Sequence, residues 1–327
     1  MKACVFCLDG FDPNMAFSND IFLPYNGYTC IPLQYSSPMA WIEFATGIPA
    51  EKNGITGYHH PNGREWNNLD LKVASYWWDS FPCKVGVMDI PIVTSPSSAI
   101  NGWMCGGYGD YPESIWPNQH FFVPPRYTPV RFPGGNASFR WDHIPTEEEI
   151  IERMQNFRLF AKYNILATTR SIELLLKKYH TDILIVYHGV IDEAGHLFRG
   201  WNKPFLCEVY KWVEQMCSII CSMMNTNNMI VVSDHGMLPL EQDENMDIWN
   251  DMKVLDGTLW YREVYDKQAH KKQYVLGSGG HVSKPYGVFS SNLPNMSDIN
   301  NVTYDMMKVG SAISNYLTQL GGSNVKG

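Results

Sequence analysis

The sequence predicts an α/β fold whose central sheet is mainly parallel and covered by helices on both faces. Three short runs are apolar throughout, as buried parallel strands are, and helical patterns lie between them. Strands that alternate with helices in this way form parallel sheets. At 327 residues the chain is long enough for one large domain with an inserted lid, or for at most two domains.

The expected elements follow in order along the chain. The apolar strands are expected at residues 3–8, 183–187 and 229–232. Thr146 and Glu149 form a capping box at the start of a long crossover helix, and Lys177 and Lys178 suit the negative end of its dipole. Two further helices are expected at about 203–224 and 304–320. Each helix connects or covers the predicted strands.

Carboxylate and imidazole side chains come directly after each of the three strands. Asp9 follows the first strand, Asp192 and His196 follow the second, and Asp234 and His235 follow the third. Ligands bind beyond the carboxyl ends of the strands in open α/β sheets, so we expect these side chains to converge. Oxygen and nitrogen donors of this kind suit Zn²⁺ or Mn²⁺. The sequence therefore predicts a two-metal hydrolase site.

Each of these patterns also has an ordinary structural explanation. An Asp-Gly pair after a strand is usually only a turn. An Asp-His pair is more often a structural hydrogen-bonded pair, and His281, which we expect on a flexible glycine-rich loop, could be a surface residue. The joint occurrence in order favours the metal site. Glu193 is expected to face solvent or to support a ligand, and the adjacent His59 and His60 are poorly placed to chelate one ion.

Ser37 is the candidate nucleophile. The sequence around it predicts a loop that feeds a helix, with Ser37 as N-cap and Pro38 at the first helical position, where proline is well tolerated. A helix N-terminus attracts anions such as phosphate. Coordination to a metal would lower the pKa of the hydroxyl and make it a nucleophile at neutral pH. The alternative is that Ser37 only caps the helix.

These segments resemble the alkaline phosphatase superfamily, in its type I phosphodiesterase/nucleotide pyrophosphatase branch. The spacing of Ser37-Pro38-Met39-Ala40-Trp41 and Thr46-Gly47 is similar to the Thr-Pro-Pro-Ala-Trp and Thr-Gly segments of its predicted phosphohydrolase/phosphomutase group. The stretches 84–91 and 100–102 also resemble that group. The resemblance extends in patches from Asp9 to His281 and implies an alkaline-phosphatase-like fold.

The resemblance also implies how the ligands divide between two metal ions. It assigns one ion to Asp192, His196 and His281, and the other to Asp9, Asp234, His235 and the Ser37 oxygen. Zn²⁺ is the expected metal, with Mn²⁺ as the alternative. Ser37 would attack phosphorus, and water would later release the phosphoryl group from the enzyme.

Four features depart from the patterns of related enzymes. The nucleophile is Ser37 where relatives commonly have Thr, and Asn53 stands where they often have His. Ala40 occupies the position at which nucleotide pyrophosphatases place a phosphate-binding Asn. No Arg follows at the spacing that sulfatases need, which argues against hydrolysis of sulfate esters.

The stretch 103–143 is predicted to be an inserted lid, and residues 1–102 and 144–327 the catalytic core. The stretch is rich in Pro, Gly and aromatic residues and has no clear periodicity. Long loops of this kind are usually functional or disordered, and the aromatic content disfavours disorder. The rings that could stack a base are Trp103, Tyr108, Tyr111 and Trp116, and Arg126 and Arg131 could meet a phosphate oxygen. Alternatively, the aromatic residues form a small core of the lid itself.

Composition limits the partners and the compartment. A formal net charge of −8 argues against broad nucleic-acid binding. The eight cysteines have no paired spacing, and we expect reduced thiols in the cytoplasm, with no signal peptide and no membrane span. The sequence does not predict an oligomeric state.

The function that these observations favour is metal-dependent cleavage of a nucleotide-like phosphodiester through a phosphoserine intermediate. A phosphomonoesterase or phosphomutase that acts on a small phosphate ester is the alternative among enzymes. The alternative from another class is an inactive metal-binding interaction protein. The presence of Ser37 together with all the expected ligands disfavours it.

Overall fold

The computed structural model has a central sheet of seven strands with β1 in its middle. In spatial order the strands are β2 (Tyr28–Ile31), β11 (Gly279–Ser291), β7 (Met229–Pro239), β1 (Ala3–Leu8), β6 (Ile183–His188), β3 (Val85–Met88) and β4 (Gly102–Cys105). The five strands from β7 to β4 pair in parallel, whereas β11 runs antiparallel to both β7 and β2. The predicted α/β fold with a mostly parallel sheet is confirmed.

The structure describes residues 2–22, 28–31, 37–55, 75–91, 93, 99–105, 140–199, 202–239, 252–255, 259–266, 271–277, 279–292 and 306–323.

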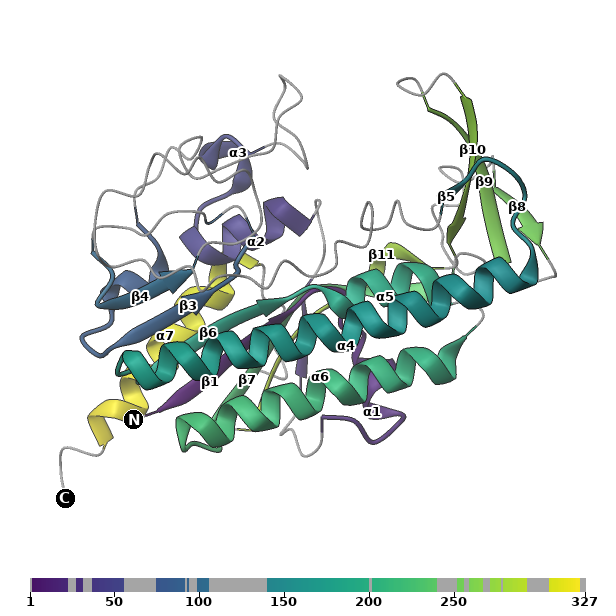
Figure 1. Ribbon diagram of the computed structural model, residues 1–327. Helices are drawn as coiled ribbons and strands as arrows, with labels where there is room; N and C mark the ends of the chain where they lie inside the picture. The colour runs from purple at the N-terminus through teal and green to yellow at the C-terminus, as the bar shows by residue number, and fades with distance from the viewer. Residues whose placement is uncertain are drawn as a thin grey trace.

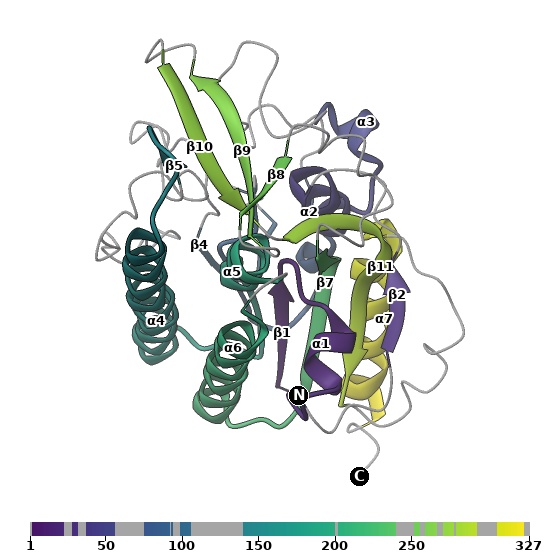
Figure 2. The ribbon, with the colours of Figure 1, turned by 90° about the vertical axis from the view of Figure 1, so that its right-hand side faces the viewer.

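Helices cover both faces of the sheet (Figures 1 and 2). On one face lie α1 (Pro13–Phe17), α4 (Glu147–Lys178), α5 (Val190–Phe198) and α6 (Lys203–Met224). On the other face lie α2 (Ser37–Thr46), α3 (Ala50–Asn53), the 3₁₀ helix η1 (Trp77–Ser80) and α7 (Met306–Ser323). None of the helices that the structure describes is long and apolar enough to cross a membrane.

The alternation of side chains along β1 divides the core into two halves. Cys4, Phe6 and Leu8 pack on the face of α4 and α6, whereas Val5 and Cys7 pack on the face of α2 and α7. All five side chains are fully buried. A strand that is buried on both faces has no polar side, which is why its sequence is a continuous apolar run. The same reason made the strand recognisable in the sequence.

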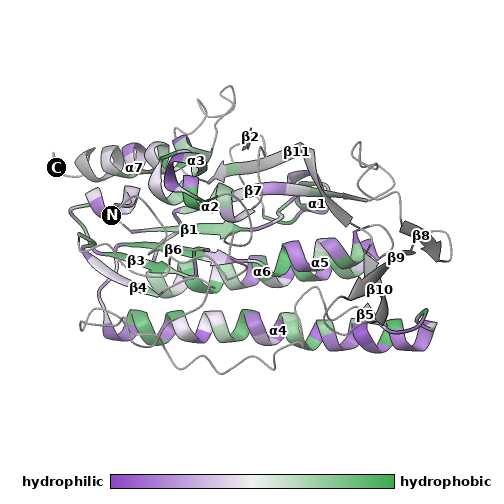
Figure 3. Ribbon diagram, turned by 90° about the horizontal axis from the view of Figure 1, so that it is seen from above, coloured by the Kyte–Doolittle hydropathy of each residue, from purple (hydrophilic) through white to green (hydrophobic). Residues whose placement is uncertain are grey.

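The crossover helix α4 confirms the prediction made from its termini. The Thr146 side chain accepts from the Glu149 backbone and the Glu149 side chain from the Thr146 backbone, so the capping box is complete. Lys177 and Lys178 end the helix, as expected. Polar and apolar residues alternate along α4 in Figure 3, and the buried ones face the sheet. The helix leads the chain back to the start of β6.

A second, antiparallel sheet lies beyond the carboxyl ends of the parallel strands (Figures 1 and 2). Its strands are β5 (Arg140–Trp141), β10 (Lys271–Gly277), β9 (Leu259–Asp266) and β8 (Met252–Leu255). None of these strands was expected from the sequence. Of the predicted lid, residues 103–105 belong to β4 of the central sheet and 140–141 to β5, while 106–139 lie outside the described residues.

Two expectations about the ends of strands are wrong. The predicted strand at 229–232 continues to Pro239, so Asp234 and His235 lie inside β7 and not after it. His281 lies in β11, opposite Met237, and not on a loop. The hydropathy pattern does not reveal the full length of these strands, because the hydrogen-bonded pairing of β7 with β11 continues through polar residues and glycines.

Candidate metal centre

Asp9 follows β1 at the edge of the sheet where the parallel strands end. Gly10, which follows it, has φ of +69°, and a Cβ atom there would lie only 2.7 Å from Cα of Asp192. Glycine thus permits both the left-handed turn and the close approach of β1 to α5. The turn leaves the Asp9 side chain 4% exposed and pointing toward β7.

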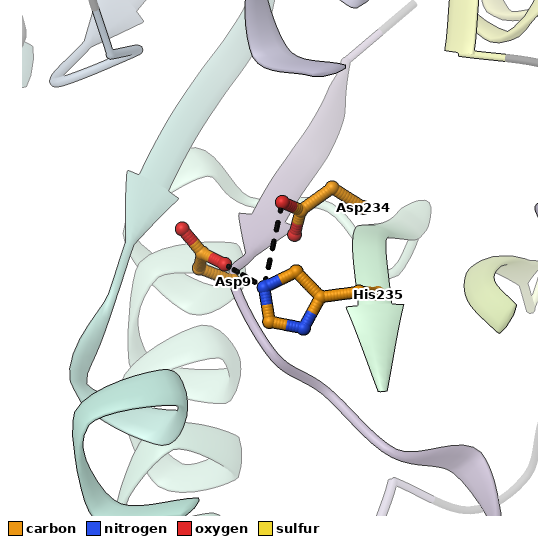
Figure 4. Close-up of side chains that lie close together, drawn as sticks. All are labelled: Asp9, Asp234 and His235. Carbon is orange, nitrogen blue, oxygen red and sulfur yellow. Dashed lines mark ion pairs between the residues drawn. The ribbon is translucent and has the colours of Figure 1, made fainter. Parts of the chain in front are cut away.

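Asp234 and His235 bring two more ligand atoms to the same place (Figure 4). One ligand atom from each of Asp9, Asp234 and His235 lies within 4.8 Å of the others. His235 Nε2 lies 3.0 Å from Asp9 Oδ1 and 3.6 Å from Asp234 Oδ2. Both Asp234 oxygens are buried and have no hydrogen-bond partner in the described part of the chain.

The charges of this cluster fit a bound cation. Burial and the charge of Asp9 raise the pKa of Asp234 well above its ordinary value. Burial disfavours the charged imidazole of His235, but Asp234, Asp9 and Asp192 outweigh it and raise its pKa. His235 Nδ1 donates to the Gly236 carbonyl at 2.9 Å, so Nε2 is the nitrogen that faces the carboxylates. This is the arrangement of a metal-binding histidine, and the donor set suits a divalent ion.

Ser37 lies against the same cluster. Its Oγ is 3.1 Å from His235 Nε2 and donates to Asp9 Oδ1 at 3.4 Å. Helix α2 begins at Ser37 itself, one residue earlier than expected, so Pro38 is the second helical residue. The hydroxyl therefore lies at the positive end of α2, next to buried carboxylates, as a nucleophile for an anionic substrate would.

Helix α5 carries two of the other three predicted ligands. Asp192 and His196 are one turn apart, with His196 Nε2 3.5 Å from Asp192 Oδ1. The same Asp192 oxygen is 3.6 Å from His235 Nε2, so it joins the α5 pair to the β7 pair. The structure describes the backbone of His281, which pairs with Met237, two residues after His235. These residues lie on α5 and β11 rather than directly after strands.

Three further residues lie near the ligands: Glu193, which was expected to face solvent or to support a ligand, and Tyr187 and Trp41, to which the sequence assigned no role. Glu193 is partly buried, and burial with the charges of Asp192 and Asp9 raises its pKa to about 8, so it is not a plain solvent-facing carboxylate. Tyr187 and Trp41 both donate hydrogen bonds to Asp9 Oδ2. Tyr187 is the next-to-last residue of a strand beside β1, and this position could have indicated that its side chain lies near Asp9.

The candidate substrate residues are only partly described. Trp103 lies in β4, is 2% exposed and donates from Nε1 to Thr181 Oγ1 at 2.8 Å. Thr181 precedes β6, at the end of the sheet opposite the ligands, so the ring of Trp103 is a core residue and the expectation that it stacks a base is not supported. Tyr108, Tyr111, Trp116, Arg126, Arg131, His59 and His60 lie outside the described residues.

Comparison with known protein families identifies the chain. The model of the family named type I phosphodiesterase / nucleotide pyrophosphatase matches residues 35–314. The chain belongs to this family. Its members are phosphoric ester hydrolases, and the match includes Ser37, Asp192, Asp234 and His281, while Asp9 precedes it. The family recognised from the nucleophile and metal motifs is therefore confirmed.

Several solved structures are similar to this family member at low sequence identity. Phosphonoacetate hydrolase from Sinorhizobium meliloti 1021, in complex with phosphonoformate, is 13% identical with a TM-score of 0.50, over 96% of this chain and 95% of that chain. Murine ectonucleotide pyrophosphatase / phosphodiesterase 5 is also 13% identical, with a TM-score of 0.49 over 97% and 95% of the two chains. No curated relative matches the chain significantly.

Proposed function

We propose that this phosphohydrolase is a two-metal-dependent phosphodiesterase that cleaves a nucleotide-like phosphodiester with Ser37 as nucleophile. The observation that carries the proposal is the contact of Ser37 Oγ with His235 Nε2, at 3.1 Å, at the start of α2 and beside the buried carboxylates. The family description supports the diester and nucleotide preference.

The predicted ligands would hold two metal ions. Zn²⁺ is the expected metal, and Mn²⁺ is the alternative. One ion would be held by Asp9, Asp234, His235 and the Ser37 oxygen, and the other by Asp192, His196 and His281. Bound ions would lower the pKa of the Ser37 hydroxyl and offset the negative charge of the phosphoryl group. The orphaned oxygens of Asp234 support this assignment because a buried carboxylate is costly unless a cation compensates it.

The chain itself supplies position and charge for the two chemical steps. Ser37 Oγ forms a bond to phosphorus while the bond to the leaving oxygen breaks, and the backbone N–H groups at the start of α2 favour the anion. Water then attacks the phosphorus of this seryl ester, which still carries the nucleotide part of the substrate. The phosphate monoester leaves, and the Ser37 hydroxyl is restored. A mutase would instead return the phosphoryl group to an acceptor.

The test compares a monoester and a diester on the same enzyme. Purified protein is chelated, supplied with Zn²⁺ or Mn²⁺, and assayed with p-nitrophenyl phosphate and with the p-nitrophenyl diester of thymidine 5′-monophosphate. We expect faster diester hydrolysis that is lost in Ser37→Ala. Ser311→Ala, on the exposed side of α7, is the matched control and keeps full activity.

The outcomes separate the candidate functions. Faster monoester hydrolysis would refute the diester preference and favour the phosphomonoesterase or phosphomutase. Activity that survives in Ser37→Ala would refute the phosphoserine intermediate. Absence of hydrolysis from the fully metal-loaded protein would favour the inactive metal-binding protein. Cytoplasmic location stays a prediction of the sequence.

A further inference from the structure

The two oxygens of the Asp9 carboxylate have different surroundings. Oδ1 faces the cluster, 3.0 Å from His235 Nε2 and 3.4 Å from Ser37 Oγ. Oδ2 faces the core, where it accepts from Tyr187 Oη at 2.5 Å and from Trp41 Nε1 at 3.3 Å. The carboxylate is therefore held from behind by two donors while its other oxygen points to the site.

Both donors come from elements whose positions are fixed independently of Asp9. Tyr187 is the residue of β6 that pairs with Cys7 of β1, two residues before Asp9. Trp41 lies one turn after Ser37 on α2, with its ring edge-to-face against Tyr187 at 5.3 Å. Trp41 is fully buried and Tyr187 is 7% exposed. Strand pairing and burial thus fix the positions of the phenol and the indole.

Such a pair of donors fixes the orientation of a carboxylate. A short hydrogen bond from a hydroxyl to a charged carboxylate is among the strong ones, and it fixes the rotation of the carboxyl group. In metal sites, partners of this kind fix the ligand, and their loss costs about 10-fold to 100-fold in metal affinity or activity.

We infer that Tyr187 and Trp41 are positioning residues that hold Asp9 as a one-oxygen metal ligand, with Oδ1 for the ion and Oδ2 reserved for the two donors. The inference rests on the proposed function, since it presupposes an ion at Asp9. Tyr187 is the stronger partner, because its hydrogen bond is shorter by 0.8 Å, from 3.3 Å to 2.5 Å.

The experiment measures metal affinity directly and does not depend on activity. Full-length metal-free protein is titrated with Zn²⁺ in competition with a chromophoric chelator, for wild type, Tyr187→Phe and Trp41→Phe. We expect the Zn²⁺ dissociation constant to rise about 10-fold to 100-fold in Tyr187→Phe and by a smaller factor in Trp41→Phe. Tyr76→Phe is the matched control, because Tyr76 is 6% exposed in the same apolar cluster and stacks on Trp78. We expect its affinity to equal that of wild type.

A second measurement distinguishes positioning from loss of stability. The Tm of the metal-free variants reports packing. We expect Tyr187→Phe and Tyr76→Phe to change Tm by similar amounts, whereas only Tyr187→Phe loses Zn²⁺ affinity. Saturating Zn²⁺ should restore most of kcat in Tyr187→Phe. If Tyr187→Phe does not fold, Trp41→Phe still tests the weaker donor to the same oxygen.

Failure of the inference and failure of the proposed function give different results. If wild type binds Zn²⁺ and hydrolyses the diester but both variants bind Zn²⁺ within twofold of wild type, only the inference is wrong. If wild type and variants differ in affinity as expected but no ester is hydrolysed, the proposed function fails and the inference stands. If wild type binds no Zn²⁺, both are wrong.

Discussion

Arg199 connects three of the segments that carry predicted ligands, and its replacement by Met should destabilise the protein strongly. Its guanidinium pairs with Asp12 Oδ2 at 2.6 Å and donates to the Met237 carbonyl at 2.9 Å. Asp12 is three residues after Asp9, Met237 is two after His235, and Arg199 itself is three after His196. One side chain thus connects the β1 turn, α5 and β7.

The expected magnitude follows from burial. The side chains are 11% and 1% exposed, so solvent does not screen the pair. Removing one partner of a buried ion pair typically costs about 3–5 kcal/mol, because the other charge is left uncompensated. Among the described residues, Asp12 would keep its cap interactions with the backbone N–H groups of Asn14 and Met15. That loss is a large part of the stability of an ordinary domain, about 5–15 kcal/mol.

Urea unfolding of the metal-free proteins at pH 7 measures this loss. Arg199→Met should lower the free energy of unfolding by about 3–5 kcal/mol, and Asp12→Asn in the same chain should recover about 1–3 kcal/mol by removing the unpaired charge. Burial raises the pKa of Asp12 and Arg199 opposes this, so without Arg199 the pKa rises further. The cost of Arg199→Met should therefore shrink as pH falls and Asp12 becomes protonated.

The reasoning would be refuted by either of two results. One is an Arg199→Met protein within about 1 kcal/mol of wild type, which would mean that the pair contributes no more than a surface ion pair. The other is an Asp12→Asn/Arg199→Met protein whose loss equals the sum of the single losses, since partners in contact should not be additive.

Three further predictions concern pH, backbone and metal. Burial lowers the pKa of His188 from 6.5 to about 4. The free energy of unfolding should therefore be unaffected by this residue above pH 6.5 and fall by about 3 kcal/mol as pH drops toward 4, a slope that His188→Gln should lack. Gly10→Ala should lower both stability and Zn²⁺ affinity more than Gly47→Ala, because the two glycines share φ near +70° but a Cβ would lie 2.7 Å from Asp192 Cα at Gly10 and 3.6 Å from Met307 O at Gly47; equal losses would contradict this. Chelation should lower Tm, and Zn²⁺ at 100 times its Kd should restore about 2.7 kcal/mol of stability; a Tm that does not respond to Zn²⁺ would contradict the metal site.

The sequence was sufficient to predict those parts of the fold and site that depend on local pattern. The fully apolar runs of β1 and β6 and the capping box of α4 each leave a mark within a few residues. Asp9 could be expected to meet Asp234 and His235 because the carboxyl ends of parallel strands share one edge. The structure brings these three side chains together.

The parts that escaped prediction depend on contacts between distant segments. Tyr187 reaches Asp9 only because β6 pairs with β1 in the register that sets it opposite Cys7. Its sequence position indicates a core strand and nothing more. The same holds for His281, whose glycine-rich surroundings suggested a loop, although the backbone pairs with β7. Register is a property of two strands, and one strand's sequence does not determine it.

The site is easier to explain as a catalytic centre than as a purely structural cluster. Three carboxylates, those of Asp9, Asp192 and Asp234, lie within 3.6 Å of His235 Nε2, and such a concentration of like charge opposes folding. A bound cation would remove that cost. A metal site without catalytic activity would, however, need the ligands alone and no nucleophile. Ser37 adds a hydroxyl at the positive end of α2, where it faces the same atoms. A hydroxyl at this position is needed if it attacks an ester, but not if the cluster is only structural. The Ser37→Ala assay therefore distinguishes a catalytic centre from a structural cluster.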